Sequence, residues 1–250
     1  MKLKDKVAIV TGGGRDIGKS VSLQLAAEGA RVAVNYRSDA EAAQATVAEI
    51  EAAGGTAILV QADVTRPEDV SRLVAETVAA FGQRVDVLVN VAGGMVARKT
   101  LADMDEAFFD QVMELNLKSA FLVTKAVLPH LGEGSAIVNL SSLAGRDGGG
   151  PGAAIYATAK GALMTFTRSL AKELGPQGIR VNALCPGLIG TSFHDIFSRP
   201  EGRRAVAGNT PLRREGHPDE VASAVVFLAS NDASFLTGVN MDINGGLGFS

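Results

Sequence analysis

The sequence predicts an α/β protein with one doubly wound parallel sheet of about seven strands and helices on both faces. Short β-branched runs alternate along the chain with longer alanine-rich segments of helical period. Strands such as residues 7–10 are apolar on both faces, as a sheet covered on both sides requires. No linker or internal repeat interrupts this alternation, so the 250 residues are expected to form a single domain.

The expected elements follow from these patterns. Strands are expected at residues 7–10, 31–34, 57–61, 85–90, 136–140, 180–184 and 239–243. Helices are expected at residues 19–28, 40–53, 67–81, 106–131, 156–174 and 218–229. Asp39 is a candidate N-cap, Gly82 and Gly175 follow helix ends, and Thr65-Arg66-Pro67-Glu68 is typical of a capping box with proline in the first turn.

One long segment has no clear periodicity. It runs from Gly187 to about Gly216. Loops of this length in compact domains are commonly functional lids. A substrate flap is therefore expected at about residues 188–216.

Composition argues against several classes of function. The chain has 24 Lys and Arg against 27 Asp and Glu, a formal charge of -3 without long runs of either sign, so no nucleic-acid or membrane partner is expected. Cys185 is the only cysteine, which excludes an intrachain disulfide and a thiolate metal cluster and fits a reducing cytoplasm. The start from Met1 to Lys6 has no apolar targeting segment, and no stretch approaches about eighteen apolar residues.

A glycine-rich turn follows the first strand and leads into a helix. It reads Thr11-Gly12-Gly13-Gly14-Arg15-Asp16-Ile17-Gly18. Glycines in such a turn let the backbone approach a pyrophosphate, whose charge then lies at a helix N-terminus. The alternative is an ordinary tight turn between strand and helix. Asp16 places a carboxylate near the expected phosphates, which is tolerable if it caps the first amides of the helix instead.

The end of the second strand indicates which dinucleotide is bound. NAD-binding sites carry an acidic residue there for the ribose hydroxyls, whereas this chain has Asn35. Arg37 follows two residues later and Arg15 lies in the glycine-rich turn, so two guanidinium groups could converge on a 2′-phosphate. NADP(H) is favoured over NAD(H), the alternative being that both arginines are solvated loop residues.

Three side chains suggest proton-transfer chemistry. Tyr156 and Lys160 are four residues apart at the start of a predicted helix, which places the phenol and the ammonium on one face. An adjacent cation favours the phenolate, so Lys160 is expected to lower the pKa of Tyr156. Ser142 ends the fifth strand, where α/β sheets bind ligands, and Ser141 is the alternative hydroxyl.

These motifs occur in an order that resembles the short-chain dehydrogenase/reductase family, and the resemblance covers essentially the whole chain to Asn244-Gly245-Gly246. It is strongest to the branch that contains bacterial 3-oxoacyl-carrier-protein reductases. Gly12 and Gly18 match the family's turn, with Asp16 in place of its middle glycine. Val91 replaces the second asparagine of the strand-four motif. A single-domain Rossmann-type fold is what the resemblance implies.

The resemblance also implies site residues. Asp63 and Val64 would contact the adenine, and Asn90, Ala92 and Gly93 would line the adenosine side, although Asn90 could be only a strand-end cap. Pro186 and Gly187 lead to Ile189 and Thr191, which would hold the nicotinamide carboxamide. The cofactor set expected in full is Gly12, Gly14, Arg15, Asp16, Ile17, Gly18, Asn35, Arg37, Asp63, Val64, Asn90, Ala92, Gly93, Tyr156, Lys160, Pro186, Gly187, Ile189 and Thr191.

The reaction implied is hydride transfer at the nicotinamide. Tyr156 would protonate the developing alkoxide, Ser142 would hydrogen-bond the same oxygen, and Lys160 would hold the nicotinamide ribose. Asn116 would hold a water that links Lys160 to solvent, or it is a satisfied core amide. Ser142, Gly187, Phe193 and His194 are candidate substrate contacts, with a surface histidine the alternative for His194. No metal is expected, because His130, His194 and His217 lack ligand spacing.

Three functions are compatible with the sequence. The favoured one is an NADP(H)-dependent oxidoreductase of a small sugar, polyol or hydroxy or keto acid. The second is a 3-oxoacyl-carrier-protein reductase, but residues 128–135 and 175–178 lack the basic residues with which such enzymes dock an acidic carrier. The third is a dinucleotide-sensing protein without turnover, against which the complete set Asn116, Ser142, Tyr156 and Lys160 argues. The family further implies a homotetramer.

Overall fold

The computed structural model describes residues 1–249 and is built around one sheet. The sheet has the strand order β3-β2-β1-β4-β5-β6-β7, and every neighbouring pair is parallel. The strands are β1 (Val7–Thr11), β2 (Arg31–Tyr36), β3 (Thr56–Gln61), β4 (Val87–Asn90), β5 (Ala136–Leu140), β6 (Arg180–Pro186) and β7 (Asn240–Ile243). The predicted doubly wound sheet is confirmed.

The helices that alternate with these strands are α1 (Asp16–Ala27), α2 (Ala40–Ala52), α3 (Pro67–Phe81), α4 (Glu106–Met113), α5 (Ser119–Val127), α6 (Ala144–Asp147), α7 (Ala154–Leu174), α8 (Ser192–Phe197), α9 (Pro200–Asn209) and α10 (Pro218–Ala229). Short 3-10 turns lie at Leu101–Asp103, Leu128–His130, Gly175–Gln177 and Asn231–Ala233. A π-helical turn, Glu114–Lys118, joins α4 to α5.

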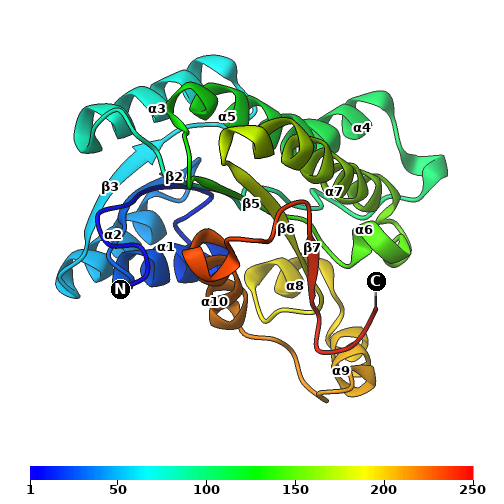
Figure 1. Cartoon of the computed structure of the whole chain (residues 1–250). Helices are drawn as coiled ribbons and strands as arrows, with labels where there is room; N and C mark the ends of the chain where they lie inside the picture. Colours follow the sequence, from blue (N-terminus) through cyan, green and yellow to red (C-terminus); the bar gives the residue numbers. More distant parts are fainter. Residues whose placement is uncertain (250) are drawn as a thin grey trace.

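The sheet is covered on both faces, with α3, α5 and α7 on one side and α1, α2 and α10 on the other (Figure 1). Alternation along β1 shows why: Ala8 and Val10 pack with the helices of one layer, while Val7 and Ile9 pack with those of the other. Each face thus has its own buried apolar cluster, which explains the near-continuous apolar runs in the strands.

The structure corrects two details of the predicted helices. The expected helix at residues 106–131 is present as continuous helical backbone from Glu106 to His130, but it contains the π turn, where the buried Asn116 side chain bonds the Val112 carbonyl of the helix and the Gly94 carbonyl outside it. The expected capping box at Thr65 to Glu68 is absent: Arg66 is the N-cap of α3 without a side-chain hydrogen bond, and Glu68 accepts from the Arg66 guanidinium instead. The Asp39 cap of α2 is confirmed by its bond from the Ala42 amide.

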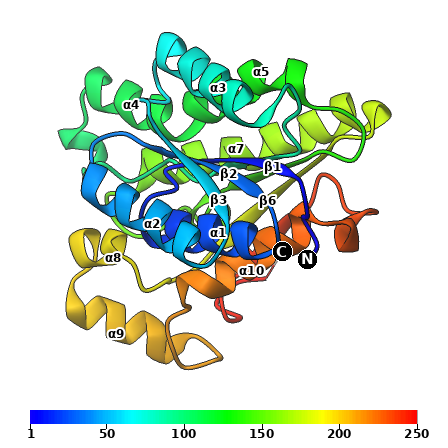
Figure 2. The ribbon, with the colours of Figure 1, turned by 90° about the vertical axis from the view of Figure 1, so that its left-hand side faces the viewer.

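Residues 188–216, the segment predicted as a substrate flap and called the flap below, contain helices that the sequence did not predict. The flap contains α8 and α9, which project from the layered body in Figures 1 and 2. No residue of α8 or α9 is buried, so neither helix leaves an apolar period in the sequence. Side-chain ion pairs hold them, since Arg203 of α9 binds Asp195 of α8 and makes a two-point contact with Glu215. Within residues 1–249, no helix is long and apolar enough to span a membrane.

Candidate active site

The candidate site lies where the carboxyl ends of β1, β4, β5 and β6 meet. From β1 the chain continues to β2 on one side, whereas β4 lies on the other side of β1. The connections therefore diverge between β1 and β4, and open α/β sheets bind ligands outside the strand ends at such a switch point.

The glycine-rich turn is closely packed against its surroundings. A Cβ on Gly18 would lie 1.9 Å from the Gly12 carbonyl oxygen, and one on Gly14 would lie 2.6 Å from the Ala43 Cβ. Larger residues at these positions would push the turn away from α1 and α2. The first amides of α1 receive no side-chain cap, because its N-cap Arg15 makes none. The turn and the open helix end therefore fit a pyrophosphate.

Asn35 shapes this turn from inside the molecule. Its Oδ1 accepts a hydrogen bond from the Gly12 amide at 3.1 Å, and its Nδ2 donates to the carbonyl oxygens of Val60 and Ala62 at 3.3 and 3.0 Å. Asn35 was predicted among the cofactor-binding residues, but its side chain is buried and bonded within the protein. Arg37 just beyond it is exposed.

The Asn90 side chain is likewise turned into the core. Its Nδ2 donates to Asn139 Oδ1 at 2.9 Å and to Thr124 Oγ1 at 3.3 Å, which ties β4 to β5 and α5. Thr11, which the sequence analysis missed, accepts hydrogen bonds from the Val91 and Ala92 amides through its Oγ1. A hydroxyl at the last position of β1 was the available signal.

The other predicted cofactor contacts differ in how deeply their side chains are buried. Asp63 is partly buried and accepts two hydrogen bonds from Thr65. The side chains of Val64 and Ile189 are buried in the core, which leaves their backbone groups for any contact. Gly187 follows Pro186 and packs so closely on Asn244 that a Cβ would lie 2.7 Å from the Asn244 Cβ. The C-terminal glycine motif thus supports the base of the flap.

Lys160 and the two serines meet at the end of β5. Lys160 is buried on α7, and its Nζ donates to the Leu140 carbonyl oxygen at 2.7 Å. Ser141 donates to the Lys160 carbonyl oxygen at 2.7 Å, so its hydroxyl fixes α7 against β5. Ser142 accepts from the Ala144 amide at 3.1 Å, and its hydroxyl lies close enough to Tyr156 to favour a lower pKa of the phenol. Ser142, and not Ser141, is therefore adjacent to the phenol.

Burial shifts the pKa values of Tyr156 and Lys160. It raises the pKa of Tyr156, with the nearby Ser142 hydroxyl acting in the opposite direction, and it lowers the pKa of Lys160 to about 8. The expectation that Lys160 lowers the pKa of Tyr156 is thus not met. The ammonium lies 5.8 Å from the centre of the Tyr156 ring and donates to the Leu140 carbonyl. The phenol is protonated at neutral pH, ready to give up a proton.

Asn116 lies in the π turn and connects it to the loop after β4. Its Nδ2 donates to the carbonyl oxygens of Gly94 and Val112 at 2.8 Å, and its Oδ1 accepts from the Gly94 amide at 2.9 Å. Gly93 is held between Asn116 and Lys160, because an added Cβ would lie 2.8 Å from Asn116 Oδ1 and 3.0 Å from Lys160 Nζ. The structure therefore brings Gly93, Asn116 and Lys160 together.

Backbone hydrogen bonds join the two ends of the flap. The Gly190 amide donates to the Gly216 carbonyl, and the Gly216 amide donates to the Leu188 carbonyl. Thr191 then caps α8 through its backbone, and its hydroxyl donates to the Ile189 carbonyl.

Within α8 the Phe193 ring centre lies 5.8 Å from that of Tyr156 and 5.0 Å from that of Phe197. His194 shares a hydrogen bond with Ser198, and burial lowers its pKa, so it is neutral at pH 7. Phe193 therefore borders the site, while His194 supports α8.

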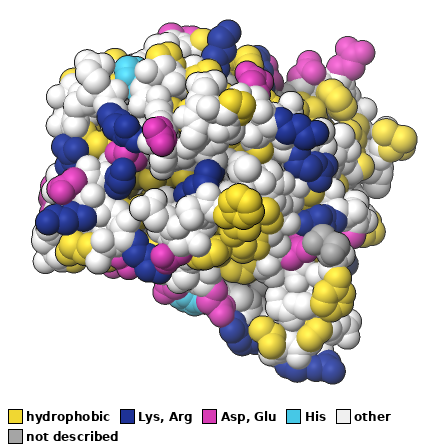
Figure 3. All heavy atoms as spheres, viewed as in Figure 1, with side chains coloured by type: hydrophobic (Ala, Val, Ile, Leu, Met, Phe, Trp, Pro, Cys, Tyr) yellow, Lys and Arg dark blue, Asp and Glu magenta, His cyan; other side chains and the backbone are white. Residues whose placement is uncertain are grey.

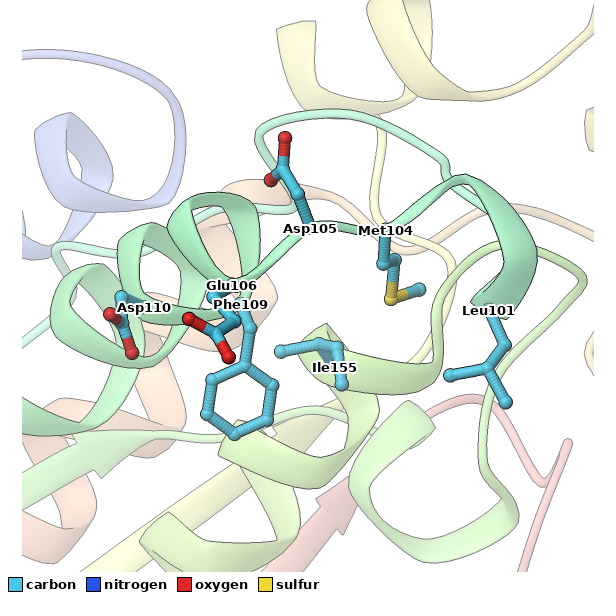
Figure 4. Close-up of a pocket in the computed structure, with 7 residues that line it drawn as sticks. All are labelled: Leu101, Met104, Asp105, Glu106, Phe109, Asp110 and Ile155. Carbon is cyan, nitrogen blue, oxygen red and sulfur yellow. The ribbon is translucent and has the colours of Figure 1, made fainter.

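A separate groove of about 380 Å³ lies beside the site between the start of α4 and the start of α7 (Figure 4). Ile155, which precedes Tyr156, lines it, but Tyr156 and Ser142 do not. Asp105, Glu106 and Asp110 line the same groove, so this neighbouring surface is acidic. In residues 1–249, no three His, Cys, Asp or Glu side chains are placed to hold a metal ion.

Comparisons with known proteins agree with this geometry. A family model described as enoyl-(acyl carrier protein) reductase matches residues 12–248. An uncharacterized oxidoreductase of Methylorubrum extorquens is 41% identical over 98% of this chain and 99% of its own length. The 3-oxoacyl-[acyl-carrier-protein] reductase of Staphylococcus aureus is 40% identical over 97% and 98%. A short-chain dehydrogenase from Burkholderia cenocepacia, solved in complex with NADP, is 36% identical, with a TM-score of 0.93 over 99% of each chain.

Proposed function

Because the chain belongs to the short-chain dehydrogenase/reductase family, close to the 3-oxoacyl-carrier-protein reductases, and is a dinucleotide-dependent oxidoreductase of CH–OH and C=O groups, we propose that it interconverts a ketone or aldehyde and an alcohol on a small substrate with NADP(H). The observation that carries this proposal is the cluster of Tyr156, Ser142 and Lys160 at the end of β5, beside the glycine-rich turn.

The roles of these side chains follow from their environments. Bound NADPH supplies the hydride. Tyr156 holds the proton that the carbonyl oxygen requires, since burial keeps the phenol protonated. Ser142 donates a hydrogen bond to the same oxygen, where negative charge develops. Lys160 fixes the nicotinamide ribose and, with a pKa of about 8, can pass a proton toward the phenol. Asn116 bonds the Gly94 backbone and so holds the loop that packs beside Lys160.

The preference for NADP(H) over NAD(H) rests on two cations and a missing acid. Arg37 is exposed at the end of β2 and Arg15 is largely exposed in the glycine-rich turn. NAD-specific sites carry an acidic residue at this position, which would repel a 2′-phosphate. Here the position holds Asn35, whose side-chain amide is bonded within the protein. Two guanidinium groups and no carboxylate at the strand end favour the phosphorylated cofactor.

Free small substrates are proposed over carrier-linked ones. The comparisons support the carrier-linked alternative about as well, so the distinction rests on surface charge. Arg98 donates to the carbonyl oxygens of Phe197 and Pro151, and Arg146 binds Asp242 at 2.6 Å. These cations hold the protein together, and carboxylates line the groove beside the site, an arrangement that does not suit an acidic partner. We also propose a homotetramer, the assembly that the family implies.

The test is a screen for NADPH oxidation. The panel contains acetoacetyl thioesters, sugar aldehydes, uronates and simple diketones, and each reaction is repeated with NADH and with the Tyr156→Phe variant. Turnover of at least one free carbonyl compound with NADPH, lost in the variant, supports the proposal. No turnover of any carbonyl or alcohol substrate, together with tight NADPH binding, would favour the non-catalytic sensor.

A further inference from the structure

Asp16 has an unusual backbone conformation for its residue type. Its φ is 50°, in the left-handed region, within a turn otherwise rich in glycine. That region is unfavourable for a residue with a Cβ, although aspartate tolerates it better than most. Glycine would fit this backbone with less strain. The side chain must therefore supply an interaction that glycine cannot.

The Asp16 carboxylate is bonded to the flap and not to its own helix. Its Oδ2 accepts a hydrogen bond from Ser192 Oγ at 2.5 Å, and its Oδ1 accepts one from the Ser192 amide at 3.0 Å. Arg15 adds a bond from its Nη1 to Ser192 Oγ at 3.3 Å. Asp16 does not cap α1, the role that the sequence analysis considered. We call the Asp16–Ser192 pair the clasp.

The clasp fixes the part of the flap that meets Tyr156. Ser192 is the first residue of α8, and the next residue is Phe193, whose ring packs against Tyr156. The other end of α8 is held by Arg98, which donates to the Phe197 carbonyl at 2.8 Å. The other polar side-chain contacts of α8 run to α9, as from Asp195 to Arg203, or stay at the helix, as between His194 and Ser198, and α8 has no buried residue.

We propose that Asp16 is a positioning residue that fastens the flap to the dinucleotide-binding turn and thereby holds Phe193 over Tyr156. The inference rests on the proposed role of Tyr156 as the proton donor. Without the clasp, the start of α8 loses its side-chain attachment to the dinucleotide-binding turn, while the contacts of Arg98 and Arg203 with α8 remain. Phe193 then leaves the phenol, water enters, and the oxygen to be protonated is no longer held beside the donor. Loss of the clasp should lower kcat by disordering the site, although Asp16 does not touch the reacting atoms.

The first test measures flap opening without any substrate. Limited trypsin digestion is followed by mass spectrometry at the bonds after Arg203 and Arg204 in α9. Asp16→Gly relieves the backbone strain and removes the clasp, so cleavage is expected to be at least about fivefold faster. Asp5→Gly is the matched control, because Asp5 also has a left-handed φ, of 62°, but is exposed and distant in sequence from the flap. Its cleavage rate should equal that of the unchanged protein.

The second test separates positioning from general stability by a double-mutant cycle. The kcat at saturating NADPH is measured for Asp16→Gly, Ser192→Ala and the double variant, with the best substrate from the screen. Each single variant is expected to lose kcat, about fivefold for Asp16→Gly, and Ser192→Ala should add less than twofold in the Asp16→Gly background. Asp16→Asn, which retains an acceptor for Ser192, should restore part of the loss.

Equal cleavage rates for Asp16→Gly and Asp5→Gly, or losses in kcat that multiply in the double variant, would overturn the clasp. If Asp16→Gly fails to fold, Ser192→Ala and Asp16→Asn carry the same comparison. The trypsin digestion does not depend on whether the protein turns over any substrate. A chain inactive on every substrate but with clasp-dependent cleavage would refute the proposed function and leave the clasp standing.

Discussion

Lys160 is buried and Tyr156 is partly buried, and reduced contact with water favours the uncharged form of each. For Lys160 the pKa falls from 10.5 to about 8, whereas the pKa of Tyr156 rises above 10. The cost of keeping Lys160 charged in the folded protein is therefore largest at neutral pH. Because its pKa is lowered in the folded protein, Lys160 makes the free energy of unfolding depend on pH.

Lys160 should make the folded protein more stable as pH rises from about 8 to about 10. Between these values the unfolded chain binds a proton at Lys160 that the folded chain has released, so the free energy of unfolding increases with pH. Tyr156 opposes this only above pH 10, where the unfolded chain loses the phenol proton first. The measurement is urea unfolding of the unchanged protein and of Lys160→Met at pH 7 and 9.5. The difference in stability should shift by about 2 kcal/mol toward the unchanged protein. A pH-independent difference would mean that Lys160 is not desolvated.

Tyr156→Phe should remove the proton donor with little change in volume. The variant is expected to fold and to bind NADPH, while kcat falls by at least about 100-fold, the effect of losing an acid catalyst. Stopped-flow turnover and NADPH fluorescence titration give the two quantities. Turnover retained within a few-fold would show that the proton comes from another group.

Replacing Arg15 and Arg37 together by alanine should raise the KM for NADPH far more than that for NADH. Each charge-assisted contact with a phosphate contributes roughly 1.5–3 kcal/mol at a well-formed site. Arg15→Ala alone is a necessary control, since Arg15 also donates to Ser192 in the clasp. Steady-state kinetics with both cofactors decides the matter, and equal changes in the two KM values would count against a 2′-phosphate site.

At the scale of elements, the sheet was the most predictable part. Every strand was expected to within two residues at its ends, because β-branched residues buried on two faces leave long apolar runs. Helix α10, Pro218–Ala229, matches its prediction at both ends. The flap helices could not be found, because exposed, ion-paired helices have no apolar period.

Asn35 and Asn90 show the same limit for the site. The sequence places them at strand ends, but whether an amide faces ligand or core depends on partners such as Val60 and Asn139.

The π turn between α4 and α5 depends on one amide. Asn116→Leu keeps the branched shape of the side chain but leaves the Gly94 amide and the Gly94 and Val112 carbonyls without their partner. An unpaired buried polar group costs about 1–3 kcal/mol, and the partly buried Gly94 groups cost less because water can reach them, so the free energy of unfolding should fall by about 2–4 kcal/mol. Gln111→Leu, on the exposed face of α4, is the control and should change little. A loss in Asn116→Leu no larger than in this control would show that the turn forms without the amide.

For the whole molecule, the surface bears on assembly. Phe109, Phe121 and Phe235 are exposed, Phe235 completely, although phenylalanine is usually buried. Figure 3 shows hydrophobic side chains gathered on the face where β7 and the end of α10 lie, among interspersed charges of both signs. Exposed aromatic side chains on α4, on α5 and after α10 are consistent with contacts between copies in the proposed homotetramer.

The surface also bears on the proposed preference for free over carrier-linked substrates. An acidic carrier protein would be attracted by lysines and arginines at the site entrance, which act mainly on the association rate. Arg98 and Arg146 are engaged with backbone and Asp242, and Lys99 lies over the Phe108 ring. Lys125 and Lys172 are the nearest cations in sequence to residues 128–135 and 175–178, the segments that lack carrier-docking lysines and arginines. The proposed preference for free substrates rests on this scarcity of cations in those segments.

We therefore expect kcat/KM for a carrier-linked 3-oxoacyl substrate to be no higher than for a short free analogue. Added salt should change the carrier-linked rate little, since few charges are available for screening. Both substrates are assayed with NADPH from low to high ionic strength. A preference for the carrier-linked substrate above about tenfold, roughly 1.4 kcal/mol, that collapses with salt would contradict this expectation. Such a result would require Arg98 to leave the Phe197 and Pro151 carbonyls for the carrier, and Arg98→Ala would then lose the preference.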